Sequence, residues 1–330
     1  MSRPEHPFAP FVRILGKGKK GSRSLTAEEA RTAMGMILDG EVRPEQLGAF
    51  LMLLRVKEEA PEELSGFVLA ARERMQVPQQ LHADLDWSSY AGKKRRLPWF
   101  LLAALALAQS GVRIFMHGAR GHMPGRIYTE DMLQQFGLRA CEDWQQVESD
   151  LARDNFAFMS IDRLSPVLGD IIQLRSILGL RSPVHTLCRL LNPLGAEYGI
   201  DGVFHPPYGP MHQQTGVLLG VRHGLTVKGD GGEAELKPDS ESELQWILGG
   251  ETHSESWPRL LPQRVVRDDD LDPQDLLKLW RGDIEHAYGE GAVVNTLAAL
   301  MKLMGRAAAP AEAVVLAREL WQARDRNRYR

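Results

Sequence analysis

The chain has 330 residues, enough for two domains or one elaborated domain, and its hydrophobic (43%) and charged (25%) fractions are those of an ordinary globular protein. The formal net charge of −3 excludes a uniformly basic protein, so any surface for a polyanion requires local segregation of charge. Two cysteines, Cys141 and Cys188, exclude a disulfide framework and a cysteine metal site. The polar, proline-rich first ten residues lack the apolar core of a signal peptide, so we expect a cytoplasmic protein.

The first 75 residues predict a compact all-helical unit. Thr26 is a suitable helix N-cap with acidic residues in the turn that follows, and Gly40 is a suitable stop. Pro44 and Pro61 each fit the first turn of a further helix. Helices are therefore predicted from residue 11 to 16, from 27 to 39, from 44 through 54 and from 61 to about 75.

Residues 78–84 form a linker, and beyond it predicted helices and strands alternate, as in an α/β layer fold. We divide the chain into a helical domain, residues 1–78, and an α/β domain, residues 79–330. The run 97–108 is apolar nearly all round, which predicts a buried helix too short to cross a bilayer. Further elements are predicted as strands at 112–116, 156–160, 218–221, 225–228 and 233–237, and as helices at 130–136, 144–153, 164–179, 183–191, 271–288, 292–304 and 311–326.

Positive charge gathers in two short segments. Four consecutive cations, Lys93, Lys94, Arg95 and Arg96, precede the buried helix, where they oppose the helix dipole by up to about 1 kcal/mol each. Such a run fits a polyanion-binding surface and fits a solvated loop equally well. The second segment is a glycine-rich turn with four cations, Lys17, Lys19, Lys20 and Arg23. No pair of the ten histidines has helical metal-ligand spacing, so no metal site is predicted.

Three segments together resemble the anthranilate phosphoribosyltransferase family, which is related to the pyrimidine-type nucleoside phosphorylases (glycosyltransferase family 3, nucleoside phosphorylase class II fold). They are residues 15–57, with Leu15-Gly-Lys-Gly and Gly48-Ala-Phe-Leu; residues 111–120, ending His117-Gly-Ala-Arg; and residues 174–193. The resemblance implies a small helical domain joined to a larger α/β domain with a mostly parallel sheet. It also implies that helices near 164–190 pack with the N-terminal helices, and that a homodimer forms through the helical domain.

The sequence departs from that family at its catalytic motifs. The Gly-Thr-Gly-Gly-Asp loop that wraps the pyrophosphate of phosphoribosyl pyrophosphate corresponds to Ser89-Tyr-Ala-Gly-Lys93, which has lost most glycines. The family's Lys-His-Gly-Asn-Arg is Met116-His-Gly-Ala-Arg120, and its magnesium-binding Asp-Glu pair falls near Ala234-Glu235. These losses imply that catalysis is lost, with no catalytic residue and no cofactor; the alternative is magnesium bound with phosphoribosyl pyrophosphate.

The pattern Ser182-x-x-His-Thr-Leu-x-Arg-Leu190 resembles the YbiB-type paralogues, which are regarded as nucleic-acid binders on this scaffold. The first hypothesis is therefore a homodimeric, sequence-nonspecific binder of DNA or RNA with no membrane association. Its basic groove would use Lys93, Lys94, Arg95, Arg96, Arg120, Arg126, Lys17, Lys19, Lys20 and Arg23. The alternative is a phosphoribosyl or glycosyl transferase with an altered substrate and an altered donor site. Its residual substrate pocket would contain His117, Arg175, His185 and Asn192, where Arg175 matches the family arginine that contacts anthranilate.

Overall fold

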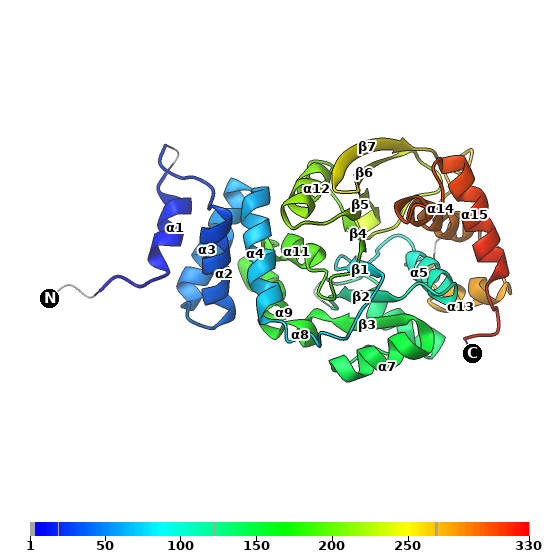
Figure 1. Ribbon diagram of the computed structural model, residues 1–330, viewed down its shortest axis with the longest axis horizontal. Helices are drawn as coiled ribbons and strands as arrows, with labels where there is room; N and C mark the ends of the chain where they lie inside the picture. Colours follow the sequence, from blue (N-terminus) through cyan, green and yellow to red (C-terminus); the bar gives the residue numbers. More distant parts are fainter. Residues whose placement is uncertain (1–3, 19, 122, 268–269, 330) are drawn as a thin grey trace.

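The computed structural model describes residues 4–18, 20–121, 123–267 and 270–329. Four N-terminal helices form a bundle at one end of the molecule, and a seven-stranded sheet with helices on both faces makes up the rest (Figure 1). The bundle helices are α1 (Ala9–Gly16), α2 (Ala27–Leu38), α3 (Pro44–Lys57) and α4 (Pro61–Arg74). The predicted helical unit is therefore present, whereas the domain boundary at residue 78 remains a prediction.

Local sequence signals explain where the bundle helices begin and how they pack. Thr26 and Glu29 form a reciprocal capping box, in which the Glu29 N–H donates to Thr26 Oγ1 at 3.2 Å and the Thr26 N–H donates to Glu29 Oε2 at 2.9 Å. Gly66 lets α4 approach α2 closely, because a Cβ atom at Gly66 would lie 2.2 Å from the carbonyl oxygen of Ala27. The bundle is thus fixed by one cap and one close helix crossing that only glycine permits.

The central sheet is mostly parallel, as predicted. Its spatial order is β3-β2-β1-β4-β5-β6-β7, where the first five strands run parallel and the last two are antiparallel. The strands are β1 (Leu85–Ser89), β2 (Ile114–Gly118), β3 (Phe156–Ser160), β4 (Tyr198–Val203), β5 (His223–Lys228), β6 (Ser242–Leu248) and β7 (Glu251–Trp257). The β6–β7 hairpin extends one edge of the parallel sheet.

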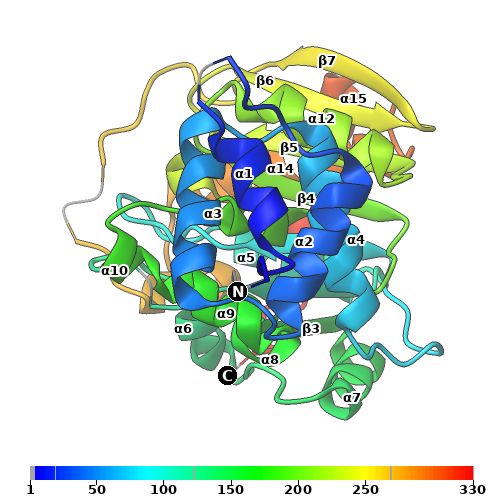
Figure 2. The ribbon, with the colours of Figure 1, turned by 90° about the vertical axis from the view of Figure 1, so that its left-hand side faces the viewer.

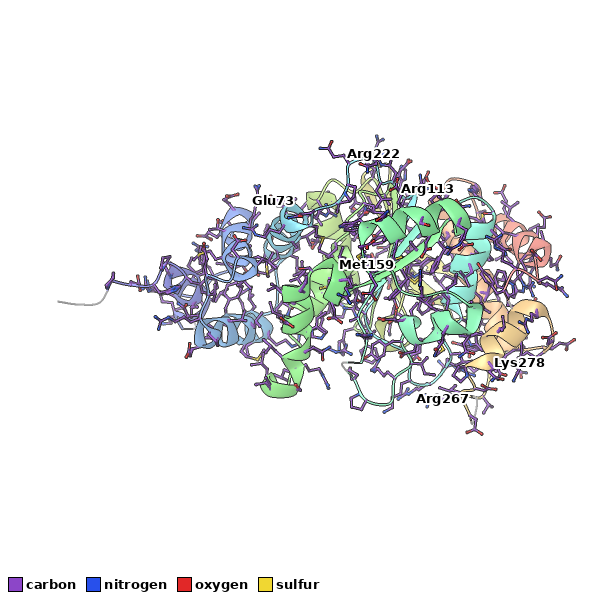
Figure 3. The ribbon with its side chains drawn as sticks, turned by 90° about the horizontal axis from the view of Figure 1, so that it is seen from below. Glu73, Arg113, Met159, Arg222, Arg267 and Lys278 are labelled. Atoms are coloured by element: carbon purple, nitrogen blue, oxygen red, sulfur yellow. The ribbon has the colours of Figure 1, made fainter. Side chains whose placement is uncertain are left out.

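Alternate residues of the parallel strands contribute to two separate hydrophobic clusters. On β2, Ile114 and Met116 face one cluster and Phe115 faces the other, because successive side chains of a strand point to opposite faces. The second cluster continues into the helical bundle through residues such as Phe50. Seen from below, Met159 on β3 lies near the middle of the molecule, where the sheet meets these helices (Figure 3). The sheet therefore holds the bundle on one face and the C-terminal helices on the other.

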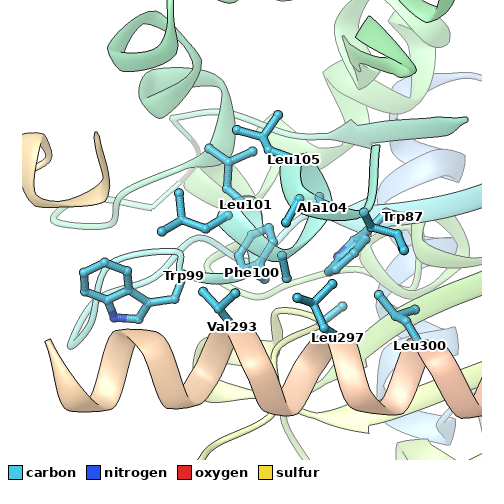
Figure 4. Packing of buried hydrophobic residues seen from close by; sticks show 14 of the residues in the cluster. Trp87, Trp99, Phe100, Leu101, Ala104, Leu105, Val293, Leu297 and Leu300 are labelled. Atoms are coloured by element: carbon cyan, nitrogen blue, oxygen red, sulfur yellow. The ribbon is translucent and has the colours of Figure 1, made fainter. Parts of the chain in front are cut away.

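The core of the first cluster forms between α5 (Phe100–Gln109) and α14 (Ala287–Leu303), whose side chains interdigitate (Figure 4). Trp87 of β1 stacks on Phe100 with 6.0 Å between ring centroids, and both rings are fully buried. The predicted buried helix is confirmed, although it begins at Phe100 and not at residue 97. Among the described residues, no helix combines the length and apolarity needed to cross a bilayer.

The remaining helices lie along both faces of the sheet and at its ends. They are α6 (Thr129–Leu133), α7 (Trp144–Asp154), α8 (Ile161–Leu164), α9 (Pro166–Gln173), α10 (Arg175–Leu178), α11 (Val184–Leu187), α12 (Tyr208–Leu218), α13 (Gln274–Arg281) and α15 (Pro310–Ala323), with short 3-10 turns η1 (Gln134–Phe136), η2 (Cys188–Leu190) and η3 (Asp230–Gly232). α11 packs on α4 and on α9, so this region does return to the N-terminal helices.

Several predicted elements differ from the structure. In place of the single helix predicted over 164–179, α8 ends at Leu164 and two short helices, α9 and α10, follow. Pro166 explains the first break, because it forces Ser165 out of the helical region (φ −155°, ψ 91°). The strand predicted at 218–221 is wrong, since α12 ends there, and residues 233–237 form a loop. Strands β1, β4, β6 and β7 and helix α12 were not predicted as such. Their residues carry mixed polar and apolar patterns whose burial depends on neighbouring strands.

We predict that Leu105→Ala in α5 lowers the free energy of unfolding by about 2–5 kcal/mol, because its side chain is fully buried in the first hydrophobic cluster. Chemical denaturation followed by circular dichroism measures this change. Val56→Ala is the matched control, since the Val56 side chain is 82% exposed and its truncation changes stability by less than about 0.5 kcal/mol. Equal effects of the two substitutions would contradict the assigned core.

Candidate functional site

The strand order places a candidate site at the carboxyl ends of β1 and β4. The chain runs outward from β1 to β2 and β3, then returns to the other side of β1 with β4, so the order reverses between these two strands. Ligands of open α/β sheets bind in the crevice at such a reversal. The loops after β1, β2, β4 and β5 contact one another there, whereas the bundle covers one face of the sheet (Figure 2).

The loop after β1 is held by a buried ion pair. Lys93 is fully buried, and its Nζ donates to Glu235 Oε1 at 2.6 Å. The other oxygen of Glu235 accepts the Phe100 N–H at 2.9 Å, at the first turn of α5. Burial raises the pKa of Glu235, and the neighbouring Lys93 ammonium opposes that rise. The lysine of this loop therefore neutralises an internal carboxylate and does not face solvent.

The expectation that residues 93–96 present four cations to a polyanion does not hold for all of them. Arg96 is 5% exposed, donates to the carbonyl oxygens of Val265 and Val266, and lies 4.0 Å over the Tyr288 ring. Lys93 is buried as described, so contact of either side chain with a phosphate chain would require the loop to unfold. Lys94 and Arg95 are exposed, so their side chains are accessible to a polyanion, and that contact remains a prediction.

Glu233 binds the backbone of the same loop. Its Oε1 accepts the N–H of Ala91 at 2.6 Å and the N–H of Gly92 at 2.5 Å. Arg126 completes the arrangement from the opposite side, donating to the carbonyl oxygens of Ala91 (3.0 Å) and Gly92 (2.8 Å). Arg126 was predicted to contact phosphate, but its Nη1 atom binds the loop backbone in this structure.

His117 lies beneath this loop and not in an open pocket. Its Nδ1 is 2.7 Å from the Tyr90 hydroxyl and its Nε2 is 3.3 Å from Asp86, and all three side chains are buried. Burial raises the pKa of Tyr90 well above its usual value. His117, which was predicted to contact substrate, therefore makes internal hydrogen bonds here.

Four arginines converge beside the loop, in the cleft between the bundle and the sheet. The pKa of Arg181 is lowered to about 10, first by burial and then by the positive charges of Arg189, Arg126 and Arg175. The Arg181 guanidinium donates to the Met123 thioether sulfur at 2.6 Å, and a thioether is a weak acceptor. Arg126 and Arg189 donate to backbone carbonyl oxygens, which are uncharged acceptors. Mutually repelling guanidinium groups with uncharged acceptors favour binding of an anion.

The arginines border two hollows in the cleft. One is a cavity of about 110 Å³ lined by Arg181, His185, Arg189, Phe204 and Tyr208 among others, with Arg55 of α3 and Glu59 of the following loop on its bundle side. The other is an open groove of about 580 Å³ that includes Arg120, Arg126 and Tyr128. The cavity is lined by both guanidinium groups and aromatic rings. This composition suits a ligand that carries both phosphate and a planar ring.

The other predicted pocket residues behave differently. His185 lines the cavity, whereas the Asn192 amide is used in a turn, donating to Ala196 O at 2.9 Å and accepting the Ala196 N–H at 2.8 Å. Arg175 is half-buried at the start of α10 and contributes to the arginine cluster. Of the four residues assigned to a substrate pocket, His185 lines this cavity and Asn192 lines a neighbouring cavity of about 50 Å³. The substrate-contacting role of these residues remains a prediction.

The N-terminal basic turn does not join this cleft within one subunit. It lies at the tip of the bundle, away from the strand ends, in both views (Figures 1 and 2). Lys17 and Lys20 are exposed, Arg23 pairs with Glu29 at 2.6 Å, and Lys19 lies outside the described residues. Arg120 is exposed and pairs with Glu130 at 3.1 Å.

The residues at the family's magnesium position do not form a paired-carboxylate site. Ala234 supplies no ligand, Glu235 is buried on Lys93, and Glu233 binds two N–H groups. Within the described part of the chain, no group of three or more His, Cys, Asp or Glu side chains is arranged to hold a metal ion. Any magnesium at this site would therefore depend on ligand oxygens.

Sequence comparison now identifies the scaffold. The helical-bundle domain model of the glycosyl transferase family matches residues 11–75, and the a/b domain model of that family matches residues 100–257. Anthranilate phosphoribosyltransferase from Beijerinckia indica is 31% identical over 302 residues, which cover 89% of this chain and 87% of that protein. The chain belongs to the anthranilate phosphoribosyltransferase-like family. The enzyme from Nitratidesulfovibrio vulgaris is 32% identical over 232 residues, covering 69% of this chain and 68% of that protein.

Solved structures support the same fold assignment. Anthranilate phosphoribosyltransferase from Thermus thermophilus matches with a TM-score of 0.80 at 23% identity, covering 96% of this chain and 94% of that one. The Saccharomyces cerevisiae enzyme, solved in complex with phosphoribosyl pyrophosphate and magnesium, matches with a TM-score of 0.77 at 17% identity, covering 97% of this chain and 94% of that one. The predicted fold class is confirmed.

Sequence reasoning missed the residues that dominate the cleft. Arg181 and Arg189 lie in the segment 174–193 that carried the family resemblance, but they were not chosen as ligand-binding residues. Glu233 and Phe204 were also missed. For the arginines a signal existed, since both lie in a segment predicted to return toward the bundle. For Glu233 none existed, because its partners are 142 and 141 positions away in sequence.

We predict that Lys93→Ala lowers the free energy of unfolding by about 3–5 kcal/mol, because it leaves the Glu235 carboxylate buried without its cation. Lys94→Ala is the matched control, since the neighbouring lysine is exposed, and we expect a change below about 0.5 kcal/mol. Urea denaturation of both variants measures the difference.

The loss of unfolding free energy in the Lys93→Ala variant should increase with pH. Burial raises the folded-state pKa of Glu235, so the folded state holds a proton that the unfolded state has released. Stability therefore falls as pH rises from the ordinary carboxyl value of 4.5 through the raised pKa. The deficit should be smaller near pH 5.5 than near pH 8; a deficit independent of pH would contradict the buried ion pair.

Proposed function

We propose that the protein has a phosphoribosyltransferase-type function with an altered donor site, in which the interdomain cleft binds a phosphorylated pentose through guanidinium groups. The observation that carries this proposal is the cluster of Arg126, Arg175, Arg181 and Arg189 beside the loop after β1. Guanidinium groups bind phosphate bidentately and remain charged even when burial lowers their pKa. The family relationship and the location at the strand-order reversal support the same ligand class.

The proposed site differs from that of the relatives in how it balances the ligand's charge. A magnesium complex needs carboxylates that hold the ion, and here Glu233 and Glu235 already bind protein N–H and ammonium groups. Asp230 of this segment does have an oxygen left for a ligand, which lies 4.0 Å from the Lys93 ammonium. The arginines supply positive charge without a resident ion. We therefore propose that phosphate binding in the cleft has little dependence on magnesium. The aromatic wall formed by Phe204 and Tyr208 would contact the ring of an acceptor or base.

We predict that calorimetry with phosphoribosyl pyrophosphate detects binding in the absence of magnesium. Added magnesium should change the dissociation constant by less than about threefold. Arg181→Ala should weaken binding by at least about tenfold, since a charged hydrogen bond contributes about 1.5–3 kcal/mol. Arg222→Ala is the control, because Arg222 is exposed on a distant surface (Figure 3). Equal binding by the two variants would overturn the assigned site.

A second candidate is sequence-nonspecific nucleic-acid binding with catalysis lost. Lys94 and Arg95 project from the loop into solvent, and the arginine cluster follows in the adjoining cleft. A polynucleotide presents the same phosphate and pentose groups as a phosphoribosyl donor. The segment Ser182–Leu190 resembles the YbiB-type paralogues, which supports this candidate. A homodimer built through the helical bundle would extend the basic surface, and it remains a prediction from the family resemblance.

If nucleic acid is the ligand, affinity for a labelled single-stranded or duplex oligonucleotide should fall steeply with salt. Each phosphate contact contributes about −0.7 to −0.9 to the slope of log K against log salt. The double substitution Lys94→Ala and Arg95→Ala should reduce that slope by about two, whereas Arg222→Ala should not. Fluorescence anisotropy measures both quantities. Absence of any shift at low salt would exclude this candidate.

A further inference from the structure

The backbone N–H groups of Ala91 and Gly92 converge on a single carboxylate oxygen. Glu233 Oε1 accepts both, at 2.6 Å and 2.5 Å, and the side chain is 1% exposed. Two successive backbone N–H groups aimed at one point form a concavity for an anionic oxygen. In this protein the occupant comes from the chain itself, from the loop that follows β5.

The segment before Glu233 is shaped to deliver that carboxylate. Gly231 and Gly232 have φ values of 71° and 96°, which side chains rarely adopt, and a Cβ atom on Gly231 would lie 2.7 Å from the carbonyl oxygen of Gly92. A Cβ atom on Gly229 would lie 1.6 Å from the carbonyl oxygen of Glu233. The glycines therefore allow the turn to close directly onto the loop after β1.

The second oxygen of Glu233 has a different environment. Among the described residues, Glu233 Oε2 is buried and has no hydrogen-bond partner. A buried carboxylate oxygen without a donor is unfavourable, so only the Oε1 atom of Glu233 stabilises its contact with the loop. Glu233 also lies within electrostatic range of Arg189 and Tyr128, which places it at the border of the arginine cleft.

We propose that the Glu233 carboxylate is an internal competitor that occupies the Ala91–Gly92 N–H pair and excludes a phosphate oxygen from it. This inference rests on the proposed function, because it concerns regulation of the same cleft. Displacement of the carboxylate frees two donors near Arg126, which already binds the carbonyl oxygens of the same two residues. The cleft then has a closed state, in which only the arginines bind anions, and an open state in which the loop backbone also binds.

The test is titration of the full-length protein with pyrophosphate by calorimetry. Glu233→Ala removes the competitor and should tighten pyrophosphate binding by at least about tenfold. Glu233→Gln keeps the shape but removes the charge, and should give a smaller gain. Glu251→Ala is the matched control, since it removes one negative charge at the exposed start of β7 and should leave the affinity unchanged. The amide resonances of Ala91 and Gly92 should shift with pyrophosphate in Glu233→Ala and not in the unmodified protein.

The outcomes separate this inference from the proposed function. If unmodified protein and Glu233→Ala bind pyrophosphate equally, in an Arg181-dependent manner, the cleft is correct and the internal competitor is wrong. If neither binds, both are wrong. If Glu233→Ala is unfolded by circular dichroism, Glu233→Gln decides alone. Unchanged affinity and unshifted Ala91 and Gly92 resonances in that variant overturn the inference.

Discussion

Two buried carboxylates, Glu233 and Glu235, fix the loop on which the rest of the site depends. One binds the N–H groups of Ala91 and Gly92, and the other binds the Lys93 ammonium and the first turn of α5. Removing either partner of the ion pair would leave a charge in an apolar interior, so the loop, the start of α5 and the segment after β5 behave as one unit. The position of the cleft wall follows from that unit.

The division of positive charge follows from the same constraint. Lys93 forms an ion pair with a buried carboxylate, Glu235. The arginines of the cleft donate instead to uncharged carbonyl oxygens and a thioether sulfur. Net charge therefore says little about the site, because the chain is slightly acidic overall. A cleft with guanidinium groups on one wall and aromatic rings on another suits a phosphorylated pentose, whether free or within a polynucleotide.

Some of the predicted site residues line the cleft and others are buried within the fold. His185 was expected in a substrate pocket and lines the cavity between the bundle and the sheet, and Arg175 is close enough to Arg181 to lower its pKa. Lys93 and Arg96 were expected in solvent and are buried, because a charge run contains no information about distant partners such as Glu235. The alternation of Lys93 and Arg96 inward with Lys94 and Arg95 outward is decided by the loop conformation alone.

The sequence by itself determined the helical unit at the N-terminus, the apolar helix α5 and the family, since caps, prolines, hydrophobic periodicity and motifs are local properties. It did not determine strands β1 and β4, the β6–β7 hairpin or the buried charges. Those depend on which segments become neighbours after folding, and a carboxylate finds its donors only when the sheet brings residues more than one hundred positions apart within hydrogen-bond distance. Tertiary structure therefore decided which cations serve the fold and which remain for a ligand.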